Sequence, residues 1–113
     1  MMRQLGYFYI MTNEHNTVLY CGATNDLCKR ILEHKNGVYS NSFTSRYNIT
    51  KLVYYEIFIF VSDAFAREKQ VKGGSRRKKL SLVEKNNPGW NDLSNKLGCS
   101  IEELIRIKNK FRR

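Results

Sequence analysis

Two short runs of apolar and aromatic residues, separated by a turn-forming segment, constrain the fold of this chain most strongly. Leu5–Met11 and Thr17–Gly22 have the composition of strands, and the "TNEHN" segment between them is typical of a turn. The pattern predicts a β-hairpin. A four-residue loop would pair Tyr9 directly with Tyr20, and a two-residue loop would slide the pairing but keep both on one face. An odd-length loop would separate them.

One strong strand and several helices are predicted after the hairpin. "KLVYYEIFIF" has the β-branched and aromatic density of a buried strand, whereas residues 38–50 are polar and mixed and are expected to form a loop. Capping residues and apolar spacing predict helices over 25–36, 62–72, 75–85 and from Ser100 onward. The order ββαβααα predicts an α+β fold, with a small three-stranded, mainly antiparallel sheet flanked by helices.

Length and charge limit the number of domains and the kind of partner. A chain of 113 residues is long enough for one domain with one core. Its net charge of +10 and pI of about 9.7 make a polyanion, nucleic acid above all, the expected partner. No apolar run approaches the roughly 20 residues of a membrane span, and no secretory signal is visible. We therefore expect a cytoplasmic protein that does not act at a membrane.

Besides Tyr9 and Tyr20, three features carry residue types used in catalysis or in nucleic-acid binding. Arg30 and His34 are one helical turn apart and share a face. Glu68 interrupts the apolar side of its helix, where a buried carboxylate needs a cationic partner, hydrogen bonds or a metal ion. Residues 67–79 hold seven basic residues and one acidic residue, with two glycines among them. Such a run can follow a phosphate backbone and supplies affinity rather than chemistry.

Each feature also has an ordinary structural explanation. Arg30 and His34 fit a solvated helix edge, and Glu68 fits a structural salt bridge. Tyr9 and Tyr20 fit simple hairpin packing, and the basic run fits a solvated surface. Composition and spacing alone leave both sets of explanations open.

The order of motifs along the chain resembles the GIY-YIG nuclease superfamily, in particular its small stand-alone URI-domain members. "YFYIM", "LYCG", "EHKNG", "FTSRY", "KLVYYE", "AFAREKQVKGGSRRKKL" and "NNPGWNDL" carry the similarity from Gly6 to Leu93. The first motif reads Tyr-Phe-Tyr rather than Gly-Ile-Tyr, but both motif tyrosines are kept. We expect residues 1–93 to form the nuclease-like domain and 94–113 to form a helical extension packed on it.

The resemblance implies a role for four residues of the hairpin and the first helix. Tyr9 and Tyr20 match the tyrosines that position and deprotonate the attacking water in the family. Arg30 matches the arginine that contacts the scissile phosphate, and His34 the histidine that many members carry one turn later. Because an unperturbed tyrosine is a weak base at neutral pH, positive neighbours near Tyr20 are expected. Gly22 is expected to allow close backbone approach to the phosphate.

The resemblance also implies a metal site and a nucleic-acid surface. Glu68 matches the carboxylate that binds a single Mg²⁺ or Mn²⁺, and Asn91 matches an asparagine that helps to hold the site in some members. Basic side chains are expected to bind the substrate: Lys29, Arg46, Lys69, Lys72, Arg76, Arg77, Lys78 and Lys79.

The expected function is that of a metal-dependent endonuclease acting on DNA rather than RNA, including structured or damaged DNA. DNA repair is one context for such an enzyme, and no small-molecule cofactor is expected. A non-catalytic nucleic-acid-binding module of the same fold is the alternative, and it predicts salt-sensitive binding without cleavage. A protein-interaction domain built on the C-terminal helix is a third interpretation.

Overall fold

The computed structural model of the chain describes residues 4–36 and 43–97. The helix predicted from Ser100, and most of the 94–113 extension, fall outside these residues. The elements are β1 (Gly6–Thr12), β2 (Leu19–Thr24), α1 (Leu27–Lys35), α2 (Phe43–Arg46), β3 (Lys51–Phe58), α3 (Val61–Lys72), α4 (Arg76–Asn86) and the 3₁₀ helix η1 (Leu93–Asn95). Within the described ranges, no helix has the length and apolar character needed to span a membrane.

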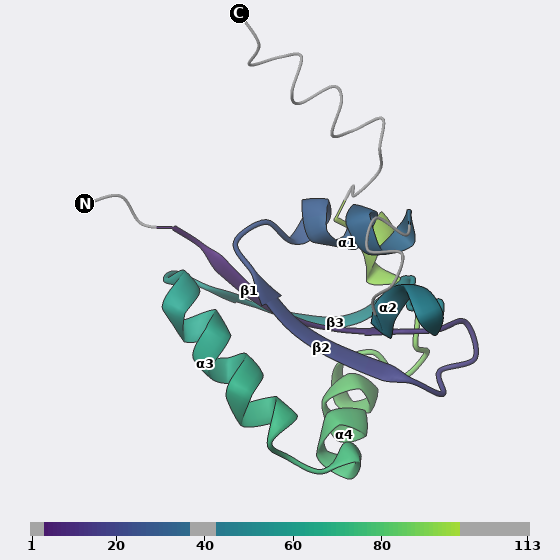
Figure 1. Cartoon of the computed structure of the whole chain (residues 1–113). Helices are drawn as coiled ribbons and strands as arrows, with labels where there is room; N and C mark the ends of the chain where they lie inside the picture. Colours follow the sequence, from purple (N-terminus) through teal and green to yellow (C-terminus); the bar gives the residue numbers. More distant parts are fainter. Residues whose placement is uncertain (1–3, 37–42, 98–113) are drawn as a thin grey trace, which may run out of the picture.

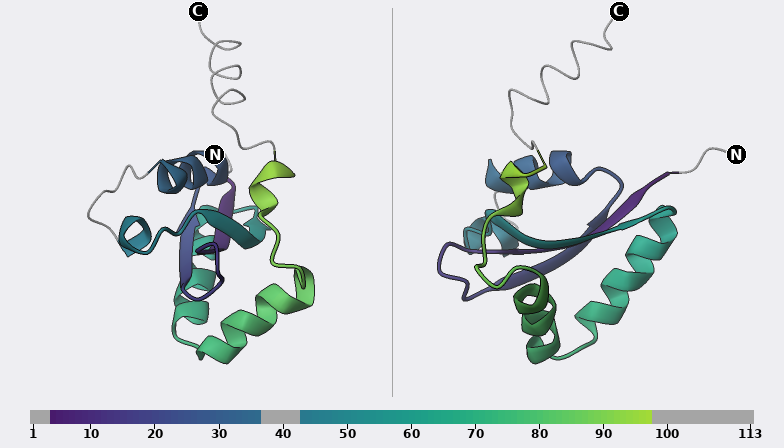
Figure 2. Two further views of the ribbon diagram at one scale, coloured as in Figure 1. Left: turned by 90° about the vertical axis from the view of Figure 1, so that its right-hand side faces the viewer. Right: turned by 180° about the vertical axis from the view of Figure 1, so that it is seen from behind.

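The three strands form one antiparallel sheet in the order β2-β1-β3, so β1 is central and β2 is an edge strand. Figure 1 shows α1 and α2 on one side of this sheet and α3 and α4 on the other. The views from the side and from behind show the same two helical layers (Figure 2). The predicted α+β fold with a small antiparallel sheet flanked by helices is confirmed.

The β1–β2 hairpin has a six-residue connection, because Thr12 pairs with Leu19. Asn13 organises this longer turn: its side-chain oxygen accepts hydrogen bonds from the backbone of Thr17 (2.8 Å) and Val18 (3.2 Å). The direct pairing of Tyr9 with Tyr20 that a four-residue loop would give is therefore absent, and Tyr9 faces Gly22. The loop is nevertheless even in length, so both tyrosines lie on one face.

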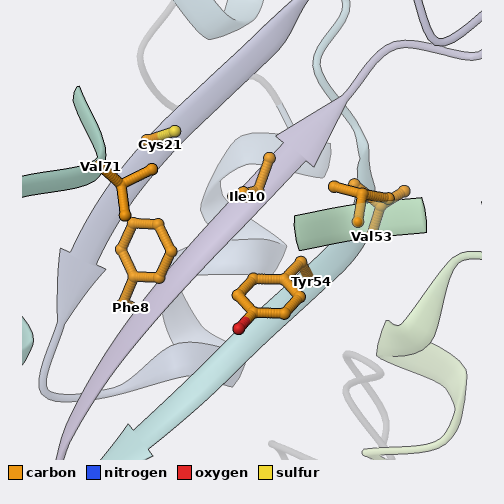
Figure 3. Close-up of a cluster of buried hydrophobic side chains, with 7 residues drawn as sticks. Phe8, Ile10, Cys21, Val53, Tyr54 and Val71 are labelled. Carbon is orange, nitrogen blue, oxygen red and sulfur yellow. The ribbon is translucent and has the colours of Figure 1, made fainter. Parts of the chain in front are cut away.

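Each face of the sheet carries its own hydrophobic cluster. Phe8 and Ile10 of β1 point toward α3 and α4 and pack with Val53, Val71 and Val83. Figure 3 shows Phe8 and Ile10 with Cys21, Val53, Tyr54 and Val71, contributed by all three strands and α3. Each fully buried side chain of this size contributes about 1.5–3 kcal/mol by leaving water. This cluster attaches the α3–α4 layer to the sheet.

The opposite face holds Tyr9 and Met11 against α1. Leu27 and Ile31 of α1, both buried, close this second cluster. Asp26 caps α1, because its side chain accepts a hydrogen bond from the backbone of Lys29. Strand β2, the Asp26 cap and helix α1 therefore lie around the buried ring of Tyr9.

Helix α2 lies within the segment predicted to be a loop. It is a single turn, and its residues have no helical periodicity of their own. Thr44 is buried, and the backbone of Ile49 donates a 2.8 Å hydrogen bond to its carbonyl oxygen. Tertiary packing and this hydrogen bond hold α2 in place, and neither can be read from the pattern of a single sequence.

Helix α3 is fixed to β3 by an ion pair. The Arg67 side chain donates hydrogen bonds to both carboxylate oxygens of Glu56, at 2.9 and 3.1 Å, while its guanidinium lies over the Phe8 ring. The Tyr54 hydroxyl also donates to Glu56. The hydrogen bond to Glu56 raises the pKa of Arg67. Arg67 therefore has a structural role within the predicted basic run.

Gly22 lies directly beneath the ring of Tyr9. A Cβ at this position would approach Cζ of Tyr9 to 2.5 Å and would also overlap its hydroxyl oxygen and Cε1. Gly22 was expected to allow approach of the phosphate. In the structure its missing side chain makes room for a tyrosine of the neighbouring strand.

Replacement of Gly22 by alanine should therefore destabilise the fold by about 1–3 kcal/mol through overpacking, although alanine suits a strand better than glycine. Gly73→Ala is the control, because Gly73 has a helical φ of −74° and its new Cβ would lie 3.4 Å from the nearest atom outside its chain neighbours. That variant should be neutral or slightly stabilising. Urea unfolding measures both changes. Equal stability of Gly22→Ala and wild type would contradict this packing account.

Candidate functional site

A buried hydrogen-bonded chain runs from β1 through α1 to α2. The hydroxyl of Tyr9 lies 3.2 Å from Nε2 of His34, and Nδ1 of His34 lies 3.0 Å from the Thr44 hydroxyl. Tyr9 is 1% exposed and His34 is 5% exposed. Hydrogen bonding at both ring nitrogens fixes the orientation of the imidazole. His34 is thus an interior residue rather than part of a solvated helix edge.

Tyr20 of β2 lies beside this chain, nearer to the solvent. Its ring centroid is 6.2 Å from that of Tyr9, in a tilted arrangement. It is 5.4 Å from that of His34, in an edge-on arrangement. On another side it stacks on Phe43, with centroids 6.4 Å apart. The predicted pair of tyrosines is therefore one continuous aromatic group with the predicted histidine.

Arg30 and Glu68 lie on different elements, and their opposite charges both act on the buried Tyr9 hydroxyl. The charge of Arg30 on α1 lowers the pKa of the Tyr9 hydroxyl, and the charge of Glu68 on α3 raises it. The Arg30 side chain is 38% exposed and lies 3.7 Å from a carboxylate oxygen of Glu33. The site thus combines a cation, a carboxylate and two phenols, supplied by two strands and two helices.

Burial sets the protonation state of the interior groups. It raises the pKa of Tyr9 far above its usual value, with a further contribution from Tyr20, and these effects outweigh the Arg30 charge. Burial also lowers the pKa of His34, and the Arg30 charge acts in the same direction. At neutral pH the structure therefore favours a protonated Tyr9 phenol and a neutral imidazole, a pair joined by a hydrogen bond rather than by charge.

Glu68 offers a single carboxylate to a metal ion. It is 20% exposed, and the ammonium of Lys72 lies 3.3 Å from its Oε1. In the described part of the chain, no three His, Cys, Asp or Glu side chains gather as a metal site. Mg²⁺ fits such a place, because it is commonly held by one or two carboxylates together with water and substrate phosphate oxygens.

Five of the eight predicted basic residues fall into two groups, and the other three are scattered. Lys72, Arg76 and Lys79 follow the edge strand β2: Lys72 lies 5.8 Å from the Tyr20 ring centroid, and Arg76 donates a 2.9 Å hydrogen bond to the Thr17 carbonyl. Burial raises the pKa of Cys21 on β2, and the charges of Lys79 and Lys72 partly offset this. This group borders the aromatic site.

Arg77 and Lys78 belong to the second group, which lines a groove of about 490 Å³ between α3 and α4. The remaining predicted residues are exposed on separate elements: Lys29 on α1, Arg46 on α2 and Lys69 on α3. The basic surface therefore extends over both helical layers.

Asn91, the last predicted site residue, lies in the segment between α4 and η1. Asn91 is exposed, and its backbone N–H and carbonyl both bond to the buried side chain of Asn87. Asn87 also donates a 3.1 Å hydrogen bond to the Val53 carbonyl, which ties its loop to β3. Sequence reasoning overlooked Asn87 and Thr44. The asparagine immediately before Pro88 was the available signal for Asn87, and nothing local pointed to Thr44.

The lowered pKa of His34 predicts a loss of stability in mild acid. In the unfolded chain His34 takes up a proton near pH 6.5, whereas in the folded chain it resists protonation. The stability that depends on neutral His34 is therefore fully present above pH 6.5. It declines as the pH falls below 6.5 toward the pKa of the folded state. His34→Gln should therefore flatten the dependence of the unfolding free energy on pH between about pH 7 and pH 5, as measured by urea unfolding. An unchanged slope would contradict the buried, neutral state of His34.

Comparisons with known proteins agree with the motifs and the fold. The family model described as the GIY-YIG catalytic domain matches residues 5–81. A UPF0213 protein of Syntrophus aciditrophicus is 38% identical over 80 residues, covering 71% of this chain and 91% of that protein. A UPF0213 protein of Staphylococcus saprophyticus is 39% identical over 77 residues, with coverages of 68% and 92%.

A solved structure is also similar. The solution NMR structure of a UPF0213 protein from Bacillus halodurans is 29% identical and has a TM-score of 0.50, and the match covers 80% of this chain and 94% of that one. The family match covers most of the described residues and includes Tyr9, Tyr20, Arg30, His34 and Glu68. The chain therefore belongs to the GIY-YIG family, among the small proteins of the UPF0213 group.

Proposed function

We propose that this protein is a divalent-metal-dependent endonuclease that hydrolyses phosphodiester bonds in DNA, including structured or damaged DNA. A GIY-YIG catalytic domain implies nuclease-like hydrolase activity and a nucleic-acid substrate in general. Geometry and charge together support the finer proposal: the Lys72 ammonium lies 3.3 Å from Glu68 and 5.8 Å from the Tyr20 ring centroid, and the charges of Arg30 and Glu68 both act on the Tyr9 hydroxyl. A cation and a carboxylate that both act on one phenol suit a phosphate that must be held and neutralised at the same time.

Arg30 would bind the scissile phosphate. Its planar guanidinium offers parallel N–H donors that match two phosphate oxygens, which a lysine ammonium does not. The side chain is partly exposed and keeps the Glu33 carboxylate at 3.7 Å, a neighbour that helps to direct it.

Glu68 would hold a single Mg²⁺ or Mn²⁺ ion. Such an ion supplies Lewis-acid stabilisation of the charge that develops on the phosphate during hydrolysis. A carboxylate oxygen is a ligand that both ions accept, and the side chain reaches solvent. In the structure the neighbouring Lys72 balances the charge of this carboxylate.

The two tyrosines take different roles. Tyr9 is buried and its pKa is raised, so it is a poor base, and we assign it to positioning through its hydrogen bond to His34. Tyr20 is partly exposed and its ring centroid lies 5.8 Å from the Lys72 ammonium, so we assign to it the contact with the attacking water. Asn91 would contribute only through its main chain, which Asn87 holds.

Substitution of Arg30 tests the assignment to the transition state. On the best substrate from a panel of single-stranded, duplex, flapped and branched DNA and RNA, Arg30→Ala should slow single-turnover cleavage by about 10²-fold or more. Arg30→Lys should recover little of this loss. Binding measured in Ca²⁺ should weaken far less, because many basic residues share that task.

Lys29→Ala is a matched control, since Lys29 is an exposed cation of the same helix. It should lower affinity slightly and leave the cleavage step unchanged. Equal losses of binding and cleavage in Arg30→Ala would reduce Arg30 to one part of the general basic surface. Binding by wild type without any cleavage across the panel would favour the non-catalytic module.

The two groups of basic residues predict the path of the substrate. Arg76→Gln/Lys79→Gln removes two charges beside β2, and Arg77→Gln/Lys78→Gln removes two from the region of the α3–α4 groove. If the substrate follows the β2 edge toward Tyr20, the first pair should weaken binding more and reduce the slope of log K against log salt by about two. The loss should be the same for all sequences. A larger loss from the second pair would place the substrate over the groove instead.

A further inference from the structure

Two exposed aromatic rings continue the site to the surface. Phe43 begins α2 and is 46% exposed, and Tyr47, which follows α2, is 44% exposed. Their ring centroids are 4.7 Å apart. Because Phe43 stacks on Tyr20 with planes only 28° apart, a row of rings leads from buried His34 through Tyr20 to Tyr47. Exposed apolar surface grouped beside a site marks a place where something binds.

The surroundings of these rings favour a nucleobase over an apolar partner. The guanidinium of Arg46 lies 5.9 Å from the Tyr47 ring centroid, and arginine accompanies aromatic rings where proteins stack bases and contact the adjoining phosphates. Among the described residues, the other large exposed apolar side chains are the aliphatic Leu5, Ile57 and Ile59 and the aromatic Phe60 and Phe65. Leu5, Ile57 and Ile59 are neighbours in sequence of Gly6 and Phe58, which pair where β1 begins and β3 ends. Figure 1 shows this end of the sheet opposite the end beside α2.

We propose that Phe43 and Tyr47 form a stacking site for one unpaired base of the substrate, beside Tyr20 of the proposed active site. The nature of the ligand rests on the proposed function. A base inside a duplex has both faces covered, so only an unpaired, terminal or flipped-out base can offer a face to these rings. The site therefore selects DNA that carries an unstacked nucleotide beside the bond to be cleaved.

Tyr47→Ala tests this proposal with the least disturbance, because Phe43 packs on Tyr20 and its loss would affect the site itself. Binding is measured in Ca²⁺ to a short single-stranded oligonucleotide and to the blunt duplex of the same sequence. We expect Tyr47→Ala to bind the single strand about tenfold more weakly, the factor that one stacked base can supply, and the duplex less than twofold more weakly. Tyr47→Phe should retain wild-type binding, since it keeps the ring.

Phe65→Ala is the matched control, because Phe65 is also 46% exposed but lies on α3. Phe65→Ala should leave the affinities for the single strand and for the duplex unchanged. Thermal unfolding of all variants checks that the fold is kept.

An abasic nucleotide moved along the single strand supplies a second readout. At one position it should weaken wild-type binding to the level of Tyr47→Ala, and at that position it should leave the binding of Tyr47→Ala unchanged.

Equal effects of Tyr47→Ala and Phe65→Ala, equal weakening for single strand and duplex, or no sensitive abasic position would overturn the stacking site. Because the readout is binding, base-dependent binding without cleavage would reject the proposed hydrolysis and keep the stacking site. Cleavage without any base effect would do the reverse.

Discussion

The close packing of Tyr9 across Gly22 is the contact on which the rest of the site depends. The hairpin register sets these residues opposite each other, and the missing side chain of Gly22 lets the phenol lie over β2. From this position the hydroxyl reaches His34, and His34 in turn reaches Thr44. One inter-strand contact thereby connects the sheet to both helices above it.

Burial of this chain explains how the site divides its work. Tyr9 and His34 are removed from water, which favours the neutral form of each and suits them to hold geometry rather than to exchange protons. The groups that keep access to solvent are Tyr20, Arg30 and Glu68. An uncharged interior bordered by a cation and a carboxylate is a suitable support for chemistry on a phosphate, because its charges need little rearrangement as the reaction proceeds.

Sequence pattern predicted the three strands, the helices α1, α3 and α4, and the shared face of Tyr9 and Tyr20. Alternation in a strand is local, and the parity of a hairpin survives a change of two residues in its loop. It did not predict the partner of Tyr9, since the side chain of Asn13 lengthens the turn through hydrogen bonds that no spacing rule anticipates.

Motif order led to Arg30, His34 and Glu68, but not to Thr44 or Asn87. The roles of these two residues arise from contacts between distant segments, His34 with α2 and Asn87 with Val53 of β3. The helical turn at α2 was missed for the same reason, because packing rather than propensity holds it.

The most direct test of the account is the metal dependence of cleavage by Glu68→Gln. The substitution keeps the size of the side chain and its ability to pair with Lys72 through the amide oxygen, but removes the charge that a divalent cation requires. Single-turnover cleavage is measured against Mg²⁺ and Mn²⁺ concentration for wild type, Glu68→Gln and Glu84→Gln, the last an exposed glutamate of α4. The account predicts cleavage that depends on the metal in wild type and Glu84→Gln and is absent in Glu68→Gln at every concentration. Cleavage by Glu68→Gln at the wild-type rate and with the same metal dependence would contradict it.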